Sequence, residues 1–201
     1  MTDDQPPQNA VKAPSAEGLA QAAGKASKKG PPPVHLWNPP FCGDLDMEIR
    51  RDGTWFYLGT PIGRQPLVKL FASILKLEDG KYFLVTPVEK VGIRVVDAPF
   101  VAVDCTVSGA GEAQDLTFTT NVGDSVTAGA ENPIRVVRAP DGEPSPYVHI
   151  RRGLEALIDR KTFYRLIDIA VPGPHEGQDW LGLWSGGKFF PVIPMAEIAP
   201  S

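Results

Sequence analysis

Apolar and polar residues alternate near residue 45, at the start of the part of the chain that we expect to fold. Leu45, Met47 and Ile49 are each followed by a polar residue, and this period of two predicts a strand with one buried face. An Asp-Gly pair at 52–53 and a second apolar run over 54–58 follow. Two strand-like runs joined by Asp-Gly predict a β-hairpin.

The spacing of apolar residues changes from two to three and four after residue 65. Pro66 stands in the first turn of this segment, where its missing N–H costs no hydrogen bond, and Asp79-Gly80 ends the segment. The apolar positions are Leu67, Leu70, Phe71, Ile74 and Leu77. A stripe with this spacing predicts a helix that packs on one face.

The rest of the chain alternates between β-like runs and two more helical patterns. The β-like runs cover 81–86, 91–96, 100–107, 116–121, 125–127, 134–138, 147–150 and a closing hairpin over 180–193. The helical patterns are Leu154, Leu157 and Ile158, and then Phe163, Leu166, Ile167 and Ala170. Asp159 precedes the second pattern at the position of an N-cap.

A match between two β-like runs indicates an internal repeat. Residues 80–88 (GKYFLVTPV) align with 187–195 (GKFFPVIPM) and share Gly, Lys, Phe, Val and Pro. We therefore predict an α+β fold of two small sub-domains related by divergent duplication, each an antiparallel sheet with a helix. The alternative is that any hairpin with one buried face tends towards this Gly-Lys-aromatic-aromatic pattern.

Residues 1–33 differ in composition from the rest of the chain. They contain no aromatic residue but hold six Pro and seven Ala, so they offer little apolar surface to offset the entropy of ordering them. We predict a disordered Pro/Ala/Lys tail over 1–33, an N-terminal sub-domain over 34–97 and a C-terminal sub-domain over 98–201. A helix over 16–29 is the alternative, because Ala, Leu, Gln and Lys favour one.

Charge and composition exclude several classes of protein. A formal net charge of −4 argues against a binder of duplex nucleic acid. Cys42 and Cys105 are too few for a disulfide framework or a zinc cluster, and no apolar stretch is long enough to span a membrane. The standard catalytic and phosphate-loop motifs are absent. We expect a soluble, cytoplasmic protein without a metal or cofactor, and binding rather than catalysis.

The densest group of chemically useful residues lies around the first hairpin. Trp55 and Tyr57 share one strand face by parity, and Arg64 stands at the start of the predicted helix, where free N–H groups favour anions. This combination suits a planar anion such as a nucleotide. The alternative is that both aromatic rings belong to the core. The remaining candidate contacts for the ligand are Lys90, His149 and Arg151.

Five runs in the sequence resemble a known family. They are 51–64 (RDGTWFYLGTPIGR), 85–90 (VTPVEK), 97–100 (DAPF), 120–122 (TNV) and 183–187 (LWSGG). The chain is similar here to an uncharacterised proteobacterial family, domain of unknown function 1285 (DUF1285). The resemblance covers nearly everything after the tail. It implies two α+β sub-domains related by duplication, the second loosely similar to pleckstrin-homology-like folds, and it implies no established activity or catalytic residue.

We therefore predict a binding module, with signal transduction as one setting for it, that holds a nucleotide-like or other small anionic ligand at the interface of its two halves. Two alternatives stay open at this point. One is an enzyme with an unrecognised acid/base site at Asp44 and Asp46 or at His149. The other is a protein-interaction module tethered by the tail.

Overall fold

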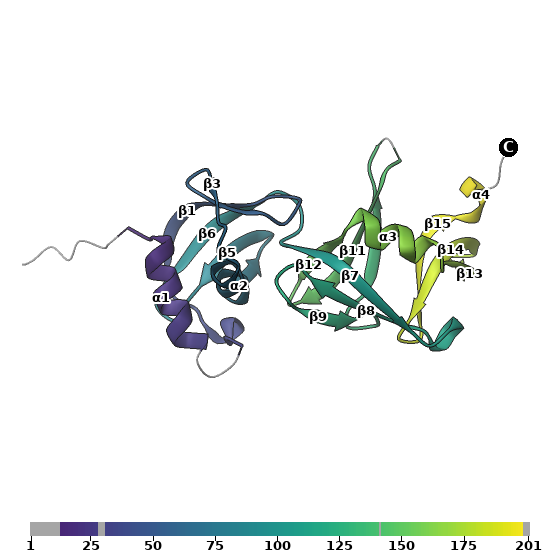
Figure 1. Cartoon of the computed structure of the whole chain (residues 1–201), viewed down its shortest axis with the longest axis horizontal. Helices are drawn as coiled ribbons and strands as arrows, with labels where there is room; N and C mark the ends of the chain where they lie inside the picture. Colours follow the sequence, from purple (N-terminus) through teal and green to yellow (C-terminus); the bar gives the residue numbers. More distant parts are fainter. Residues whose placement is uncertain (1–12, 28–30, 141, 199–201) are drawn as a thin grey trace, which may run out of the picture.

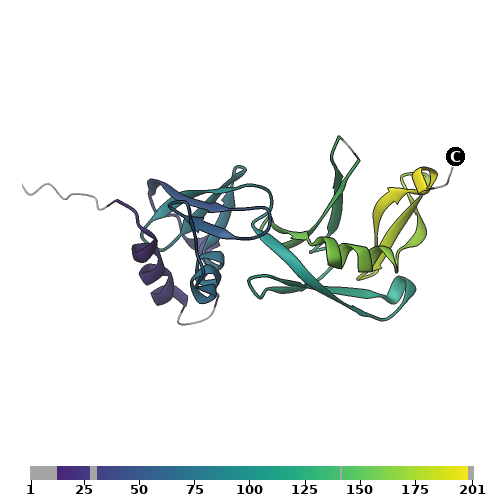
Figure 2. The same ribbon diagram turned by 45° about the horizontal axis from the view of Figure 1, so that its top comes forward.

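The protein is elongated, with two domains side by side along its long axis (Figures 1 and 2). The computed structural model describes residues 13–27, 31–140 and 142–198. The strands of the N-terminal domain end at Val95 and those of the C-terminal domain begin at Phe100, on either side of the predicted boundary at 97/98. Both domains are mostly β-sheet with few helices, so the α+β class is confirmed.

The helices of the described residues are short. They are α1 (Ala16–Ala26), α2 (Gln65–Ser73), α3 (Arg160–Ile167) and α4 (Met195–Ile198), with 3-10 turns η2 (Val34–Leu36) and η3 (Gly111–Ala113). None of the helices in these ranges is long and apolar enough to cross a membrane.

The described strands form two six-stranded sheets and one three-stranded sheet. The N-terminal sheet holds β1 (Phe41–Ile49), β2 (Trp55–Tyr57), β3 (Thr60–Pro61), β4 (Leu75–Glu78), β5 (Lys81–Val85) and β6 (Lys90–Val95). The C-terminal sheet holds β7 (Phe100–Ser108), β8 (Asp115–Thr120), β9 (Ser125–Thr127), β10 (Ile134–Arg138), β11 (Pro144–Arg151) and β12 (Leu154–Ile158). The third sheet holds β13 (Val171–His175), β14 (Gln178–Ser185) and β15 (Lys188–Pro194).

The first hairpin and the helix after it are confirmed. β1 buries Leu45, Met47 and Ile49 and pairs antiparallel with β2. α2 begins at Gln65 with Pro66 in its first turn, but it ends at Ser73. Residues 75–78 form β4 instead of continuing the helix. The prediction that the helix extends to Leu77 is therefore wrong by about one turn.

In the C-terminal domain, one predicted helix is a strand and the other is confirmed. Leu154, Leu157 and Ile158 belong to β12, in which the buried residues are Leu154, Ala156 and Ile158, at a period of two. α3 follows directly, and the Asp159 carboxylate accepts the Thr162 N–H at 2.7 Å as its N-cap. The helix prediction counted Leu157 and left out Ala156. The small Ala156 side chain is buried between Leu154 and Ile158 on one strand face, and Leu157 lies on the other face.

The two six-stranded sheets have the same strand order. The N-terminal order is β3-β2-β1-β6-β5-β4, and the C-terminal sheet reads β9-β8-β7-β12-β11-β10 in the same sense. The two central strands of each sheet are its first and last along the chain, and they pair in parallel: β1 with β6, and β7 with β12. All remaining strand pairs in the two sheets are antiparallel. The sheets are thus mixed, and the predicted purely antiparallel sheets are wrong.

The predicted residue match between 80–88 and 187–195 does not follow this common order. It aligns β5 with β15, but β5 occupies the position of β11 in the shared order, and β15 lies in the three-stranded sheet. The match therefore joins strands at unrelated positions. Its similar letters reflect two hairpin strands that each start at a Gly-Lys turn.

Part of the predicted disordered tail is helical. α1 packs beside α2 (Figure 1), and its Leu19 and Ala23 are fully buried. Ser15 caps it, because its side-chain oxygen accepts the Gly18 N–H at 3.2 Å. The tail prediction is wrong for 16–26, and residues 1–12 and 28–30 lie outside the described part of the chain.

The three-stranded sheet is joined to the six-stranded sheet of the C-terminal domain by a buried hydroxyl. Ser185 accepts the Leu116 N–H and donates to the Ala128 carbonyl, both at 2.8 Å, and its side chain is fully buried. Gln114 adds a bond to the Trp184 carbonyl at 2.8 Å. The family-like run at 183–187 therefore joins two sheets.

Candidate functional site

The interface between the two domains, which we call the seam, contains a cavity of about 530 Å³. Its walls come from the end of α2, the turn between β8 and β9, the turn between β11 and β12, and the segment that precedes η2. The polar residues of the wall are Lys69, Ser73, Asp124, Arg151 and Arg152. We call this space the seam cavity. Three cations and one carboxylate therefore face a single opening formed by both domains.

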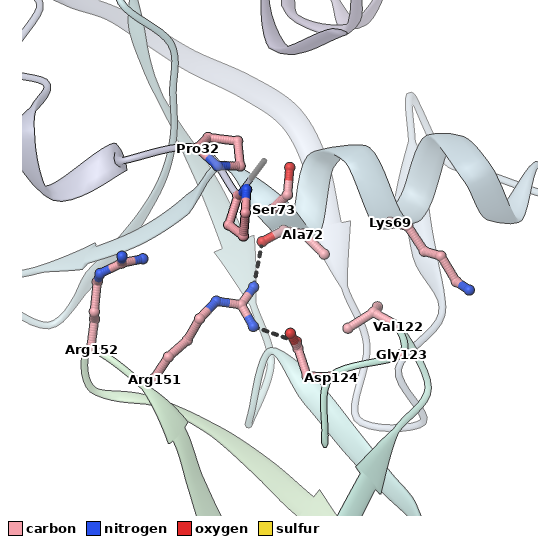
Figure 3. Close-up of a pocket in the computed structure, with 10 residues that line it drawn as sticks. Pro32, Lys69, Ala72, Ser73, Val122, Gly123, Asp124, Arg151 and Arg152 are labelled. Carbon is pink, nitrogen blue, oxygen red and sulfur yellow. Dashed lines mark hydrogen bonds and ion pairs between the residues drawn. The ribbon is translucent and has the colours of Figure 1, made fainter. Parts of the chain in front are cut away.

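Arg151 occupies the middle of the seam cavity (Figure 3). It donates to the Ala72 carbonyl at 2.9 Å and forms an ion pair with Asp124. Its guanidinium also lies 4.9 Å from the centre of the Phe100 ring. A cation at the carbonyl end of α2 is favourable, because that end carries partial negative charge. Arg151 thus ties the two domains together, and its charge is matched by Asp124.

Lys69 and Arg152 flank Arg151 on opposite sides in Figure 3. Both side chains are exposed, and neither makes an ion pair with another described residue. The carbonyl end of α2 repels an anion near Ala72, so an anion is expected nearer to Lys69 and Arg152. Of the three described cations that line the seam cavity, these two have no carboxylate partner.

Arg152 also has an unusual backbone conformation. Its φ is +48°, followed by Gly153 at +77°, which is typical of a two-residue turn that prefers Asn-Gly. An Arg in this position is strained, since its Cβ crowds the backbone. The same turn shape occurs at Glu176-Gly177, far from the cavity in sequence. The turn therefore does not need Arg152 for its own stability.

The predicted aromatic platform is not available to a ligand. Trp55 is 1% exposed, and its ring stacks on Phe71 with centroids 6.2 Å apart. Tyr57 is half-buried and packs against the core. The stacking role predicted for Trp55 does not fit this burial, and the alternative of a core residue describes it.

Arg64 and Arg151 do not meet. Arg64 is the exposed residue before α2, whereas Arg151 binds Ala72 near the other end of that helix. Ala72 comes eight positions after Arg64, which is about 12 Å along the helix at 1.5 Å per residue. The prediction that Arg64 and Arg151 contact one ligand therefore does not fit a small ligand, and residues 154–158 after Arg151 form a strand instead of the predicted helix.

The remaining predicted contacts already have partners. Lys90 pairs with Glu78 at 2.8 Å and lies 5.0 Å from the centre of the Phe83 ring. Hydrogen bonds from Lys76 and then Lys90 hold the pKa of Glu78 below its usual value. His149 bonds to the backbone on both ring nitrogens. Of the predicted site residues, only Arg151 lines the seam cavity.

A register shift explains why Arg151 departs from the predicted strand face. In a regular strand Tyr147, His149 and Arg151 would share one face, but the pairing of β11 with β12 shifts between His149 and Arg151. Such a bulge re-aims the side chain that follows it. Tyr147 consequently bonds to Asp97, while Arg151 reaches Ala72 and Asp124.

Neither Lys69 nor Arg152 was predicted from the sequence. Lys69 looked like an ordinary exposed helix residue, and Arg152 like part of a helix start. The Arg-Arg-Gly run at 151–153 was the one available signal for Arg152. A residue other than Asn before a turn glycine has a strained backbone, and strained residues are often found at functional sites. No signal in the sequence links Lys69 to Arg152.

Three of the family-like runs meet at the seam. Asn121 accepts the Val101 N–H at 3.0 Å and donates to the Gly53 carbonyl at 3.4 Å. A Cβ at Gly53 would lie 2.6 Å from the Asn121 amide nitrogen, and the φ of Gly53 is +81°. Only glycine allows this approach without displacement. The first hairpin turn is therefore shaped to fit against the C-terminal domain.

A second cluster of polar contacts between the two domains is centred on Asp97. Tyr147 donates to its carboxylate at 2.8 Å, and Arg51 forms an ion pair with it at 3.3 Å. Arg51 also donates to Ser145 at 2.8 Å. Burial and the bond to Asp97 raise the pKa of Tyr147. These contacts join residues from both domains, so they add to the packing between the domains outside the seam cavity.

The two carboxylates of the alternative acid/base site lie on the surface of β1, where Asp44 borders a shallow pocket within the N-terminal domain. Asp44 and Asp46 are both exposed on β1. Among the residues that the structure describes, no group of three or more His, Cys, Asp and Glu side chains is placed to hold a metal ion. The seam cavity is a place where charged side chains of both domains converge on a hollow, with Lys69 from α2 and Arg152 from the C-terminal domain.

This two-domain α+β fold matches family models over both of its parts. The model "Domain of unknown function (DUF1285), N-terminal domain" matches residues 32–98, and "Protein of unknown function (DUF1285), C-terminal domain" matches 99–192. The chain belongs to the DUF1285 family. No protein of curated function matches it significantly.

Two solved structures of this family are similar to the chain. A DUF1285 family protein from Silicibacter pomeroyi DSS-3 is 62% identical, with a TM-score of 0.82, over 92% of this chain and 99% of that one. A DUF1285 family protein from Shewanella baltica OS155 is 32% identical, with a TM-score of 0.49, over 62% of this chain and 91% of that one.

Proposed function

We propose that this protein is a binding module that holds a small anionic ligand in the seam cavity. The observation that carries the proposal is the convergence of Lys69, Arg151 and Arg152, from both domains, on a cavity whose wall has one carboxylate, Asp124. Because Asp124 and the end of α2 engage Arg151, the cations left to attract an anion are Lys69 and Arg152, on either side of it.

The lining of the cavity narrows the predicted ligand. Its described lining contains no aromatic ring, and its apolar contacts come from Pro31, Pro32, Ala72 and Val122. A nucleobase would therefore lack an aromatic ring to stack on among these residues. The ligand is therefore a compact anion with two or more negative charges, such as a phosphate ester or a dicarboxylate, and a nucleotide would bind through its phosphates alone.

The proposal is tested by calorimetric titration with sulfate, phosphate, dicarboxylates and nucleotides. Arg152→Asn should weaken binding about three- to tenfold, since it removes one charge-assisted contact, while the melting temperature stays the same or rises because Asn suits the turn. Glu176→Asn is the matched control, with the same turn change elsewhere. Equal affinity in Arg152→Asn and wild type would contradict the proposal.

A second pair of variants tests the other cation. Lys69→Gln should weaken the same ligand by a similar factor, whereas Lys161→Gln, an exposed lysine on α3, should leave its affinity unchanged. Both substitutions keep good helix formers. An equal loss in the two variants would point to a general effect of net charge instead of a site.

We also propose that the two domains arose by duplication, which the identical strand order and pairing directions of the two sheets support. A pleckstrin-homology-like character of the C-terminal domain, a role in signal transduction and a cytoplasmic location stay predictions from the sequence.

A further inference from the structure

The hydrogen bonds of His149 fix the position of its ring proton. Its Nδ1 lies 2.9 Å from the Glu131 carbonyl, and its Nε2 lies 3.0 Å from the Gly153 amide nitrogen. A carbonyl only accepts and a backbone N–H only donates. Nδ1 therefore carries the proton, and Nε2 must stay unprotonated to accept from Gly153.

The bond from Gly153 holds the turn that carries two cations of the seam cavity. Arg151, Arg152 and Gly153 follow His149 within four residues, and the turn joins β11 to β12. Asn132 supports the same stretch from the other side, donating to the carbonyls of His149 and Ile150 at 2.8 and 3.0 Å. His149 and Asn132 thus hold the bulge that directs Arg151 and Arg152 to the cavity.

The charged groups around His149 are committed to other partners. Glu155 lies opposite His149 in the pairing of β11 with β12. Arg135 on β10 donates two hydrogen bonds to the Glu155 carboxylate, at 2.7 and 2.5 Å. Glu131 contributes its backbone carbonyl to the ring. Arg151 faces Asp124, which leaves Arg152 as the nearby cation without an ion pair in the described residues.

We infer that His149 is a positioning residue that makes anion binding in the seam cavity depend on its protonation. Histidine is the side chain that ordinarily changes charge between pH 5 and 8. A proton on Nε2 would oppose the Gly153 N–H, break that bond and release the turn with Arg152. This inference rests on the proposed anion site, and it predicts weaker binding at low pH although the protein then carries more positive charge.

Sulfate is the probe for the test, because its charge stays constant between pH 5.5 and 8. Its affinity for the wild type should fall about three- to tenfold from pH 8 to pH 5.5, as expected from the loss of one hydrogen bond. His149→Gln offers an uncharged donor and acceptor that does not titrate, so its affinity should differ little between the two pH values. His175→Gln is the control and should behave as the wild type.

The Gly153 amide resonance of the wild type gives a second readout, which needs no variant. Its shift should titrate with the same midpoint as the sulfate affinity. An amide that does not respond to pH, or a wild-type affinity that rises at pH 5.5, would overturn the inference. Sulfate binding with the same pH ratio in His149→Gln and wild type would also overturn it and leave the anion site intact. Absence of sulfate binding at pH 8 would remove the proposed site itself.

Discussion

The two cysteine side chains of this protein differ in solvent exposure, and this difference can be measured by alkylation. Cys105 on β7 is 4% exposed, and burial raises the pKa of its thiol to about 12. Cys42 is half-buried near the start of β1. The nucleophile in alkylation is the thiolate, and a raised pKa keeps Cys105 in its neutral form at any pH well below 12.

We therefore expect iodoacetamide at pH 8 to modify Cys42 and to leave Cys105 untouched in the folded protein. Mass spectrometry of the digested product measures both sites. Denaturation in urea should make the two react alike, because the unfolded chain removes the burial that raises the pKa. Alkylation of Cys105 at the rate of Cys42 without denaturant would contradict the burial described for β7.

Arg151 illustrates how far single residues could be predicted from the sequence. Its charge and its place beside a turn were evident, and so was its position near the interface of the halves. Its partners were not, because the bulge between His149 and Arg151 changes the face on which it lies. Trp55 failed for a different reason, since a strand residue with a large ring looks the same in sequence whether the core or a ligand covers it.

At the scale of elements, α1 is the main difference from the predicted disordered tail, and the alternative of a helix over 16–29 describes this segment better. The sequence of α1 is mostly Ala, Gly and polar residues, so its one large apolar residue, Leu19, gives no stripe to recognise. Tertiary packing stabilises such a helix where propensity alone does not. Strands β1, β2, β5 to β11, β14 and β15 were predicted from period two or from turn signals. β13 was missed because Pro172 and Pro174 argued against a strand.

Leu19→Ala tests whether α1 is part of the folded domain. The side chain is fully buried, so its truncation should lower the free energy of unfolding by about 2–3 kcal/mol, or by the whole docking energy of α1 if that is smaller. Urea titration measures the change. In Gln21→Ala, the control at an exposed position of the same helix, the midpoint should hardly move. Equal midpoints for Leu19→Ala and wild type would support the disordered tail.

At the scale of the whole molecule, the residues that meet at the seam could not be predicted from the sequence. Lys69 and Arg152 are far apart along the chain, and only the packing of the two domains puts them on one cavity. That packing depends on close approaches such as Gly53 against Asn121, which no periodicity encodes. The expectation that function lies between the halves stays a prediction, and it now has defined walls and defined cations.

The most direct measurement for the anion site is a map of backbone amide shifts during a sulfate titration of the full chain. We predict that the largest shifts fall on Gly123, Asp124 and Arg152, which line the seam cavity on two separate turns, and that they follow one saturating curve. Shifts that gather on another part of the surface, or that rise linearly without saturation, would contradict an anion site in the seam cavity.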